Sequence, residues 1–131
     1  MQTLAQMDIL VVDDDPDTRD LLRFMLEDEG AIVTVAPNAK EALSLLEREL
    51  PKLLVSDVAM PEMDGFELIG RVRELPKGET LPAIALTAYA REEDRQAALR
   101  SGFNDYLTKP VDPLELIRLV QQYCLAFPPD A

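Results

Sequence analysis

Histidine and tryptophan are absent from the 131 residues, and cysteine occurs once, at Cys124. Without histidine, the chain has no Ser-His-Asp triad, no histidine metal site and no phosphohistidine of its own. One cysteine excludes an internal disulfide and a zinc site built from several thiolates. This cysteine usage is typical of a reducing compartment, and we expect a soluble protein of the cytoplasm.

Long apolar segments are also absent. The longest unbroken apolar run, residues 123–127, has five residues, whereas a transmembrane helix needs about 20. Residues 1–8 contain neither a basic region nor a long apolar stretch, so no signal peptide is visible.

Basic residues are scarce relative to acidic ones. The chain has 13 Lys and Arg against 25 Asp and Glu, which gives a formal net charge of −12. A surface this negative repels nucleic acid and anionic lipid, so we expect no direct nucleic acid binding and no membrane insertion. The excess carboxylates can hold a hard cation.

Short apolar segments alternate with helical patterns along what the length predicts to be one domain. The segments at residues 9–12, 31–35, 53–55 and 83–86 are aliphatic and too short for ordinary helices, and residues 105–107 form a fifth, less regular one. Their continuous rather than alternating hydrophobicity is typical of strands buried on both faces.

Helix signals occupy the segments between these strands. Capping pairs open four of the helices: Asp15 with Pro16, Asn38 with Glu41, Asp64 with Glu67, and Asp112 with Pro113. Strict alternation of five strands and five helices predicts an α/β fold, a single (βα)5 doubly wound parallel sheet with helices on both faces. We expect the domain at residues 8–125, with tails at residues 1–7 and 126–131, and fraying at residues 1–6 and 128–131.

Polar side chains gather where the predicted strands end. In order along the chain they are Asp13, Asp14 and Asp15, then Ser56 and Asp57, then Thr87, then Thr108 and Lys109. Ligands of open α/β sheets bind beyond the carboxyl ends of the strands, so these side chains should meet at one rim. Clustered carboxylates need a cation, and an all-oxygen site favours Mg²⁺ or Mn²⁺. A carboxylate beside a metal and a lysine can act as a nucleophile toward phosphorus.

Other interpretations of the acidic residues are possible. Helix starts favour acids, which explains Asp17, and Asp57 taken alone fits an ordinary turn. A calcium EF-hand starting at Asp13 fails, because its sixth and twelfth positions are Thr18 and Phe24 instead of Gly and Glu. A haloacid-dehalogenase-type phosphatase also starts with Asp-x-Asp, but Asp17 stands where that family has Thr or Val. No glycine-rich nucleotide-binding motif is present.

Four sequence motifs occur in order within residues 8–125: ILVVDDDPD, LLVSDVAMPEMDGFEL, IALTAYA and FNDYLTKPVD. Together they resemble the receiver domain of two-component response regulators and hybrid histidine kinases. The resemblance implies the strand order 2-1-3-4-5. It also implies a phosphorylation-dependent signalling switch, with slow self-dephosphorylation only, rather than a metabolic enzyme.

The resemblance assigns the metal site to matching positions. Asp13, Asp14 and Asp57 would hold Mg²⁺, with Mn²⁺ as a substitute, and the backbone carbonyl of Ala59 would complete the protein's ligands. Asp14 would bind the metal directly, and Asp13 would act largely through water.

The resemblance also assigns the phosphoryl chemistry. Asp57 would accept the phosphoryl group, Lys109 and Thr87 would contact it, and the rotamer of Tyr106 would follow Thr87 as a switch. The Lys109-Pro110 peptide bond would be cis and aim the lysine into the site.

The implied phosphodonor is the phosphohistidine of a sensor histidine kinase or a histidine phosphotransfer protein. A downstream protein would bind the face formed by the fourth helix, the fifth strand and the fifth helix. The sequences of residues 86–90 and 102–111 resemble those of hybrid kinases and phosphorelays more than those of DNA-binding regulators, and we expect no DNA-binding domain after the last helix. The alternatives are an aspartyl-phosphate phosphatase acting on small phosphate esters and an interaction module that never needs phosphate.

The residues two positions after the acceptor and two after the threonine flank the water that hydrolyses the phosphoryl group in this family. Here they are Ala59 and Tyr89. Ala59 cannot orient a water, and a Tyr89 ring turned inward would shade the phosphoryl group, whereas one turned to solvent would not. We therefore expect a long-lived phosphorylated state.

Overall fold

The computed structural model describes residues 4–89 and 91–126, which form five parallel strands and the helices that cover them. The strands are β1 (Asp8–Val12), β2 (Ile32–Ala36), β3 (Leu53–Asp57), β4 (Ala83–Thr87) and β5 (Asp105–Thr108). The helices are α1 (Pro16–Asp28), α2 (Ala39–Arg48), α3 (Gly65–Glu74), α4 (Glu92–Ser101) and α5 (Pro113–Ala126), with a short 3-10 helix η1 (Gly78–Thr80) that was not predicted.

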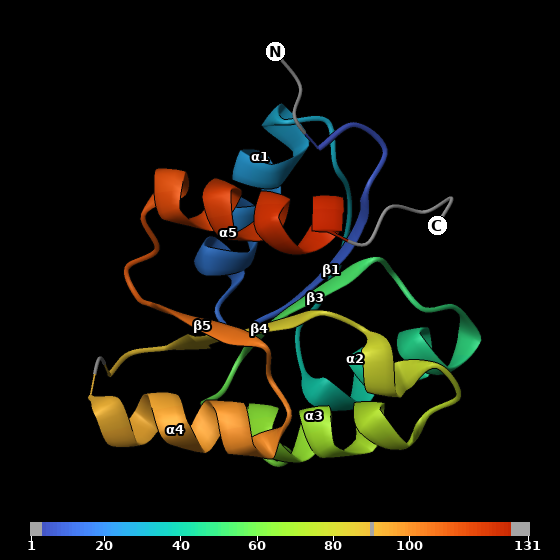
Figure 1. Ribbon diagram of the computed structural model, residues 1–131, viewed down its shortest axis with the longest axis vertical. Coiled ribbons are helices and arrows are strands. Elements are labelled where there is room, and N and C mark those ends of the chain that lie inside the picture. Colours follow the sequence, from blue (N-terminus) through green and yellow to red (C-terminus); the bar gives the residue numbers. More distant parts are fainter. Residues whose placement is uncertain (1–3, 90, 127–131) are drawn as a thin grey trace.

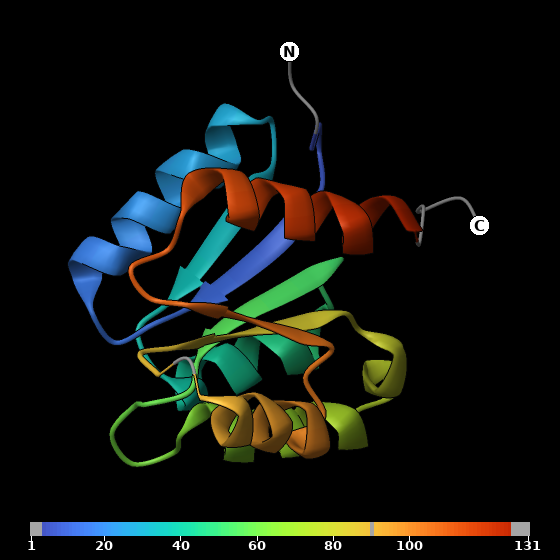
Figure 2. The same cartoon turned by 60° about the vertical axis from the view of Figure 1, so that its left-hand side comes forward.

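The sheet has the order β2-β1-β3-β4-β5, as predicted, and every pairing is parallel. Helices α1 and α5 cover one face, and α2, α3 and α4 cover the other (Figures 1 and 2). The predicted doubly wound α/β fold is therefore confirmed. No helix within residues 4–89 and 91–126 has the length and apolar character needed to cross a membrane.

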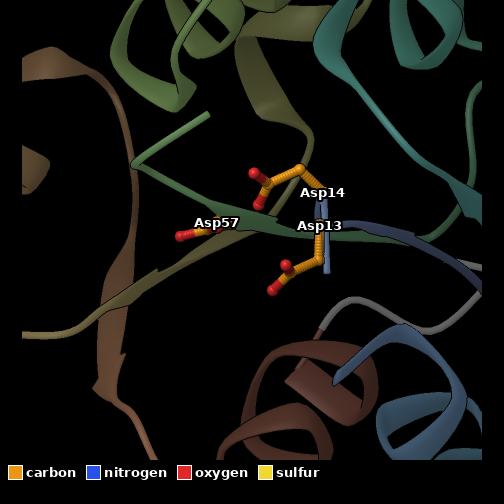
Figure 3. Close-up of side chains that lie close together, drawn as sticks. All are labelled: Asp13, Asp14 and Asp57. Atoms are coloured by element: carbon orange, nitrogen blue, oxygen red, sulfur yellow. The ribbon is translucent and has the colours of Figure 1, made fainter. Parts of the chain in front are cut away.

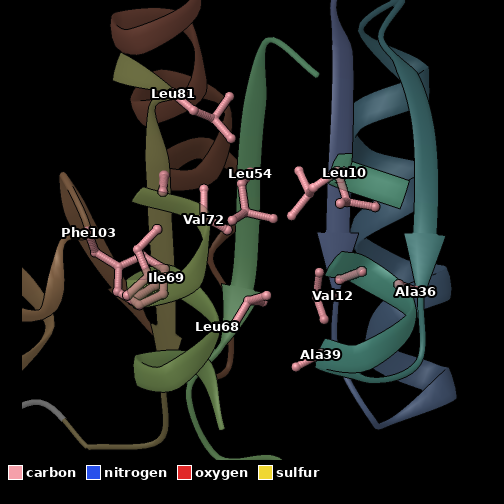
Figure 4. Close-up of a cluster of buried hydrophobic side chains, with 14 of the residues drawn as sticks. Leu10, Val12, Ala36, Ala39, Leu54, Leu68, Ile69, Val72, Leu81 and Phe103 are labelled. Carbon is pink, nitrogen blue, oxygen red and sulfur yellow. The ribbon is translucent and has the colours of Figure 1, made fainter. Parts of the chain in front are cut away.

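Each face of the sheet has its own hydrophobic core. Alternate residues of β1 divide between them: Ile9 and Val11 pack under α1 and α5, whereas Leu10 and Val12 pack against α2 and α3. Figure 4 shows the second core, in which Leu54 of β3 meets side chains of the covering helices. Two covered faces explain the continuous apolar runs, and each fully buried leucine stabilises the fold by about 2 kcal/mol.

Local capping holds the helix starts where the sequence predicts them. The side chains of Asn38 and Asp64 accept hydrogen bonds from the backbone N–H groups three residues later, at 2.8 and 2.9 Å. Asp15 caps α1 by accepting from the Asp17 N–H at 3.2 Å. After α1, Gly30 adopts a φ of 95°, a conformation that favours glycine and ends the helix.

The strands extend further toward their carboxyl ends than the apolar pattern predicts. Ser56, Asp57, Thr87 and Thr108 belong to the strands instead of following them. The parallel ladder continues through them, because Asp57 pairs with Leu86 and Thr87 with Thr108. Backbone pairing does not require an apolar side chain, so hydrophobicity alone ended the strands too early.

The expected fraying of the N-terminal segment is wrong for the part that the structure describes. Leu4 is fully buried in the core under α1 and α5. Its N–H donates to the Glu29 carbonyl at 2.8 Å, and the Gln6 N–H donates to the Gly30 carbonyl at 2.9 Å. These bonds tie the segment to the end of α1. Residues 1–3 and 128–131, also expected to fray, lie outside the described residues.

Candidate functional site

Parallel strands that end at one edge of the sheet bring the predicted site residues together. Asp57 and Thr87 are the last residues of β3 and β4, Asp13 directly follows β1, and Lys109 directly follows β5. Since β1, β3, β4 and β5 are successive neighbours, residues far apart in sequence become neighbours in space.

Three carboxylates form the centre of this edge. Oxygens of Asp13, Asp14 and Asp57 all lie within 4.8 Å of one another. The side chains of Asp13 and Asp57 are buried, whereas Asp14 is exposed. Figure 3 shows the three side chains projecting from the ends of two strands around a common space. Such close like charges require a positive partner.

Lys109 supplies one such charge. Its Nζ lies 2.9 Å from Asp13 Oδ2 and 3.3 Å from Asp57 Oδ2, and the Lys109-Pro110 peptide bond is cis, as predicted. Burial lowers the pKa of Lys109, but its contacts with Asp13 and Asp57 outweigh this and raise the pKa above the ordinary value. The lysine is therefore charged, and the cluster of three acids and one lysine still carries excess negative charge.

The donor set fits a hard divalent cation. Asp13 Oδ2 is buried, and within the described residues its close partner is the charged Nζ of Lys109 at 2.9 Å. One ammonium group cannot neutralise three clustered carboxylates, so the cluster favours binding of a further cation. Carboxylate oxygens are the ligands that Mg²⁺ prefers. Asp57 Oδ1 accepts a hydrogen bond from the Ala59 N–H at 3.2 Å, so Ala59, whose carbonyl is the predicted ligand, lies beside the three carboxylates.

Asp57 lies in a position that disfavours its negative charge. Burial raises the pKa of Asp57 above its ordinary value and the charge of Asp13 raises it further, while Lys109 and the Ala59 N–H oppose the shift. The folded state therefore disfavours the ionised form of Asp57 when no metal is bound.

Replacing Asp57 by Asn should stabilise the metal-free protein at neutral pH, because a neutral amide removes this repulsion. We expect the melting temperature in chelator at pH 7 to rise by about 3 °C, the shift that roughly 1 kcal/mol produces in a domain of this size. A raised carboxyl pKa favours the folded state at low pH, so the advantage should vanish near pH 4. Asp64→Asn, at an exposed cap, should change little. A lower melting temperature for Asp57→Asn at pH 7 would contradict the argument.

Thr87 is oriented by its neighbour. Its Oγ1 accepts a hydrogen bond from the Tyr89 N–H at 3.1 Å, so the hydroxyl proton is available to another acceptor. The Tyr89 side chain is exposed, with the guanidinium carbon of Arg91 5.3 Å from its ring centroid. The ring thus lies at the surface, and Tyr89 lines, with Ala59 and Thr87, a recess of about 440 Å³.

Two further residues complete the surroundings of the site. Tyr106, the predicted switch residue, is half-buried on β5, and the guanidinium carbon of Arg95 on α4 lies 5.9 Å from its ring centroid. Arg19 was not predicted. Its Nη1 donates to the carbonyl of Asp13 at 2.8 Å. The only sequence signal for this contact is a basic residue one helical turn after the Asp15 cap.

Comparison with known proteins agrees with this geometry. The profile of the response regulator receiver domain matches residues 9–121. Response regulator Rre1 of Synechocystis sp. is 39% identical over 114 residues, which cover 86% of this chain and 49% of the relative. The chain thus spans about half the length of that relative.

Solved structures agree as well. The chemotaxis protein CheY4 of Vibrio cholerae is 31% identical with a TM-score of 0.87, covering 92% of this chain and 100% of that one. The receiver domain of sensor histidine kinase PA1611 from Pseudomonas aeruginosa, solved with a magnesium ion in its active site cleft, is 34% identical with a TM-score of 0.84, covering 91% and 98%. This chain belongs to the family of response regulator receiver domains, the phosphorylation-controlled switches of two-component signalling.

Proposed function

We propose that Asp57 of this domain accepts a phosphoryl group from the phosphohistidine of a sensor histidine kinase or histidine phosphotransfer protein. The observation that carries the proposal is the meeting of Asp13, Asp14 and Asp57 with Lys109 at one strand edge. Receiver domains as a class interact with such donors and bind Mg²⁺ in an acidic pocket. No observation favours the phosphatase alternative.

The transfer uses the side chains at this edge. An Asp57 oxygen forms a bond to phosphorus with its lone pair, while the phosphorus–nitrogen bond of the donor breaks and its electron pair stays on the imidazole. Asp13, Asp14, Asp57 and the Ala59 carbonyl would hold Mg²⁺, or Mn²⁺ in its place. When bound, the metal neutralises charge on the transferred oxygens. Lys109 and the free hydroxyl proton of Thr87 bind the same oxygens and stabilise the transition state.

The new charge then acts on the output face. Thr87 turns toward the phosphoryl group, Tyr106 follows, and the contact of Arg95 with its ring couples β5 to α4. The α4–β5–α5 face consequently shifts between two populations and binds a downstream protein. With a net charge of −12, the domain does not bind nucleic acid directly. It spans residues 8–125, acts in the cytoplasm beside its donor, and dephosphorylates itself only slowly.

An apolar groove between α1 and α5 supports docking of a protein donor. Leu21 and Phe24 on α1 and Leu114 on α5 are 51%, 69% and 73% exposed. They line a groove of about 490 Å³. Helix α1 starts at the turn that carries the acidic pair and runs into this groove, so a partner helix in the groove can extend along α1 to the phosphoacceptor edge. Exposed large apolar side chains in one patch mark an interaction site.

The test separates docking from chemistry. Phe24→Glu should slow phosphotransfer from the cognate histidine donor, identified by profiling candidate kinases, by about tenfold or more. Labelling by acetyl phosphate should stay at the wild-type rate, because that donor needs no protein contact. Ile32→Glu is the matched control. Ile32 is 52% exposed and is the first residue of β2, so it lies at the amino ends of the strands, away from the phosphoacceptor edge. Equal rates for Phe24→Glu and wild type with every donor would contradict docking in this groove.

A further inference from the structure

Within the described residues, the side chain of Arg19 makes one hydrogen bond, and this bond lies at the base of the metal site. The side chain reaches back from the first turns of α1, and Nη1 donates to the carbonyl oxygen of Asp13 at 2.8 Å. Arg19 is half-buried and forms no ion pair with any residue in the described parts of the chain. Its charge is therefore directed at a backbone carbonyl instead of a carboxylate.

The carbonyl that Arg19 binds belongs to the peptide unit joining Asp13 to Asp14. A peptide unit is planar, so holding its oxygen fixes the backbone torsions on both sides of the plane. One of these torsions orients Asp13, and the other orients Asp14. A single hydrogen bond thus constrains the relative placement of the two carboxylates.

The two acids depend on this plane to different degrees. Asp13 is also held elsewhere, because its N–H donates to the Ala36 carbonyl at 3.2 Å and its Oδ1 accepts from the Asp15 N–H at 2.9 Å. Within the described residues, Asp14 has neither a side-chain hydrogen bond nor an ion pair. The position of its carboxylate is decided by its backbone, which Arg19 holds.

We propose that Arg19 is a positioning residue for the metal site: it locks the Asp13–Asp14 peptide so that both carboxylates face the cation. This inference rests on the proposed function, which places a divalent cation between them. Contacts that orient metal ligands commonly change metal affinity by tenfold or more when they are removed.

The sign of the effect distinguishes positioning from simple electrostatics. Removing a positive charge from an acidic cluster strengthens cation binding by reducing repulsion. Removing a contact that holds the ligands weakens it. Arg19→Gln should therefore raise the dissociation constant for Mg²⁺ about tenfold, against the direction that the lost charge alone dictates.

Arg23→Gln provides the matched control. Arg23 lies one turn further along α1, and its side chain forms an exposed ion pair with Glu27 at 3.2 Å. Replacing Arg23 therefore removes the same charge without altering the turn at Asp13 and Asp14. Isothermal titration with Mg²⁺ should give Arg23→Gln wild-type or slightly tighter binding. Arg19→Lys keeps the charge without the guanidinium, and it should bind at least about threefold more weakly than wild type.

A cooperative thermal unfolding transition establishes that each variant is folded. If Arg19→Gln does not fold, the affinity of Arg19→Lys decides the question. Acetyl phosphate labelling of the Arg19 variants should approach the wild-type rate at saturating Mg²⁺, because only metal affinity is changed. Unchanged or tighter Mg²⁺ binding by the folded Arg19 variants overturns the inference alone. No Mg²⁺ binding by the wild type overturns it together with the proposed metal site.

Discussion

Acetyl phosphate and Mg²⁺ should add one phosphoryl group to the wild-type domain and none to Asp57→Asn, as read from the intact mass. Asp57 is the buried acid of the cluster that terminates a central strand, contacts Lys109 at 3.3 Å and lies against Asp13 and Asp14. An amide cannot replace the carboxylate as nucleophile, so labelling should fall by roughly a hundredfold or more. Chelation of Mg²⁺ should have a similar effect on the wild type.

The control for this experiment is Asp64→Asn, which makes the same chemical change at an exposed position in the loop after Asp57. Asp64 caps α3 by accepting from the Glu67 N–H, and asparagine caps helices equally well. Its labelling should match the wild type. Persistent labelling of Asp57→Asn would move the acceptor to another carboxylate, and labelling that survives chelation would remove the metal role of Asp13 and Asp14.

The phosphorylated wild type should keep its label about tenfold longer than the double variant Ala59→Asn/Tyr89→Glu with Mg²⁺ present. Hydrolysis needs a water aligned with the phosphorus–oxygen bond to Asp57, and positioned reactants supply most of the rate in such steps. Neither Ala59 nor Tyr89 has a carboxylate or amide side chain to hold that water in the recess beside Thr87. The two carboxylates that also line the recess have other partners: Asp64 accepts from the Glu67 N–H, and Asp94 pairs with Arg91. The double variant introduces both an amide and a carboxylate.

Single variants assign the effect to one position or the other. The exposed Tyr89 ring beside Arg91 leaves the recess open, so Tyr89→Phe should leave the lifetime unchanged. Faster loss in Ala59→Asn than in Tyr89→Glu would locate the missing water contact on the β3–α3 side. A wild type that loses its label as fast as the double variant would show that these side chains do not control the lifetime.

Local signals in the sequence predicted most of the fold. The caps at Asp15, Asn38 and Asp64 depend on hydrogen bonds within two or three residues, so their chemistry is readable without the rest of the chain. The continuous apolar runs likewise predicted that both faces of the sheet are covered by helices. Strand ends were predicted too early at Asp57 and Thr87, because ladder pairing is decided by the neighbouring strand.

The sequence by itself determined which chemistry the strand ends could carry. Strictly alternating strands and helices make all strands parallel, so the carboxyl ends of the strands lie at one edge of the sheet. Only the tertiary structure decided how close these groups come: Lys109 reaches Asp13 and Asp57, and these contacts raise the pKa of Lys109. It also decided that Asp57 is buried beside Asp13, which raises the pKa of Asp57. The same holds for the burial of Leu4 and the contact of Arg19 with the Asp13 carbonyl. These depend on distances between segments separated along the chain or on the path of a turn, which residue types and spacing do not encode.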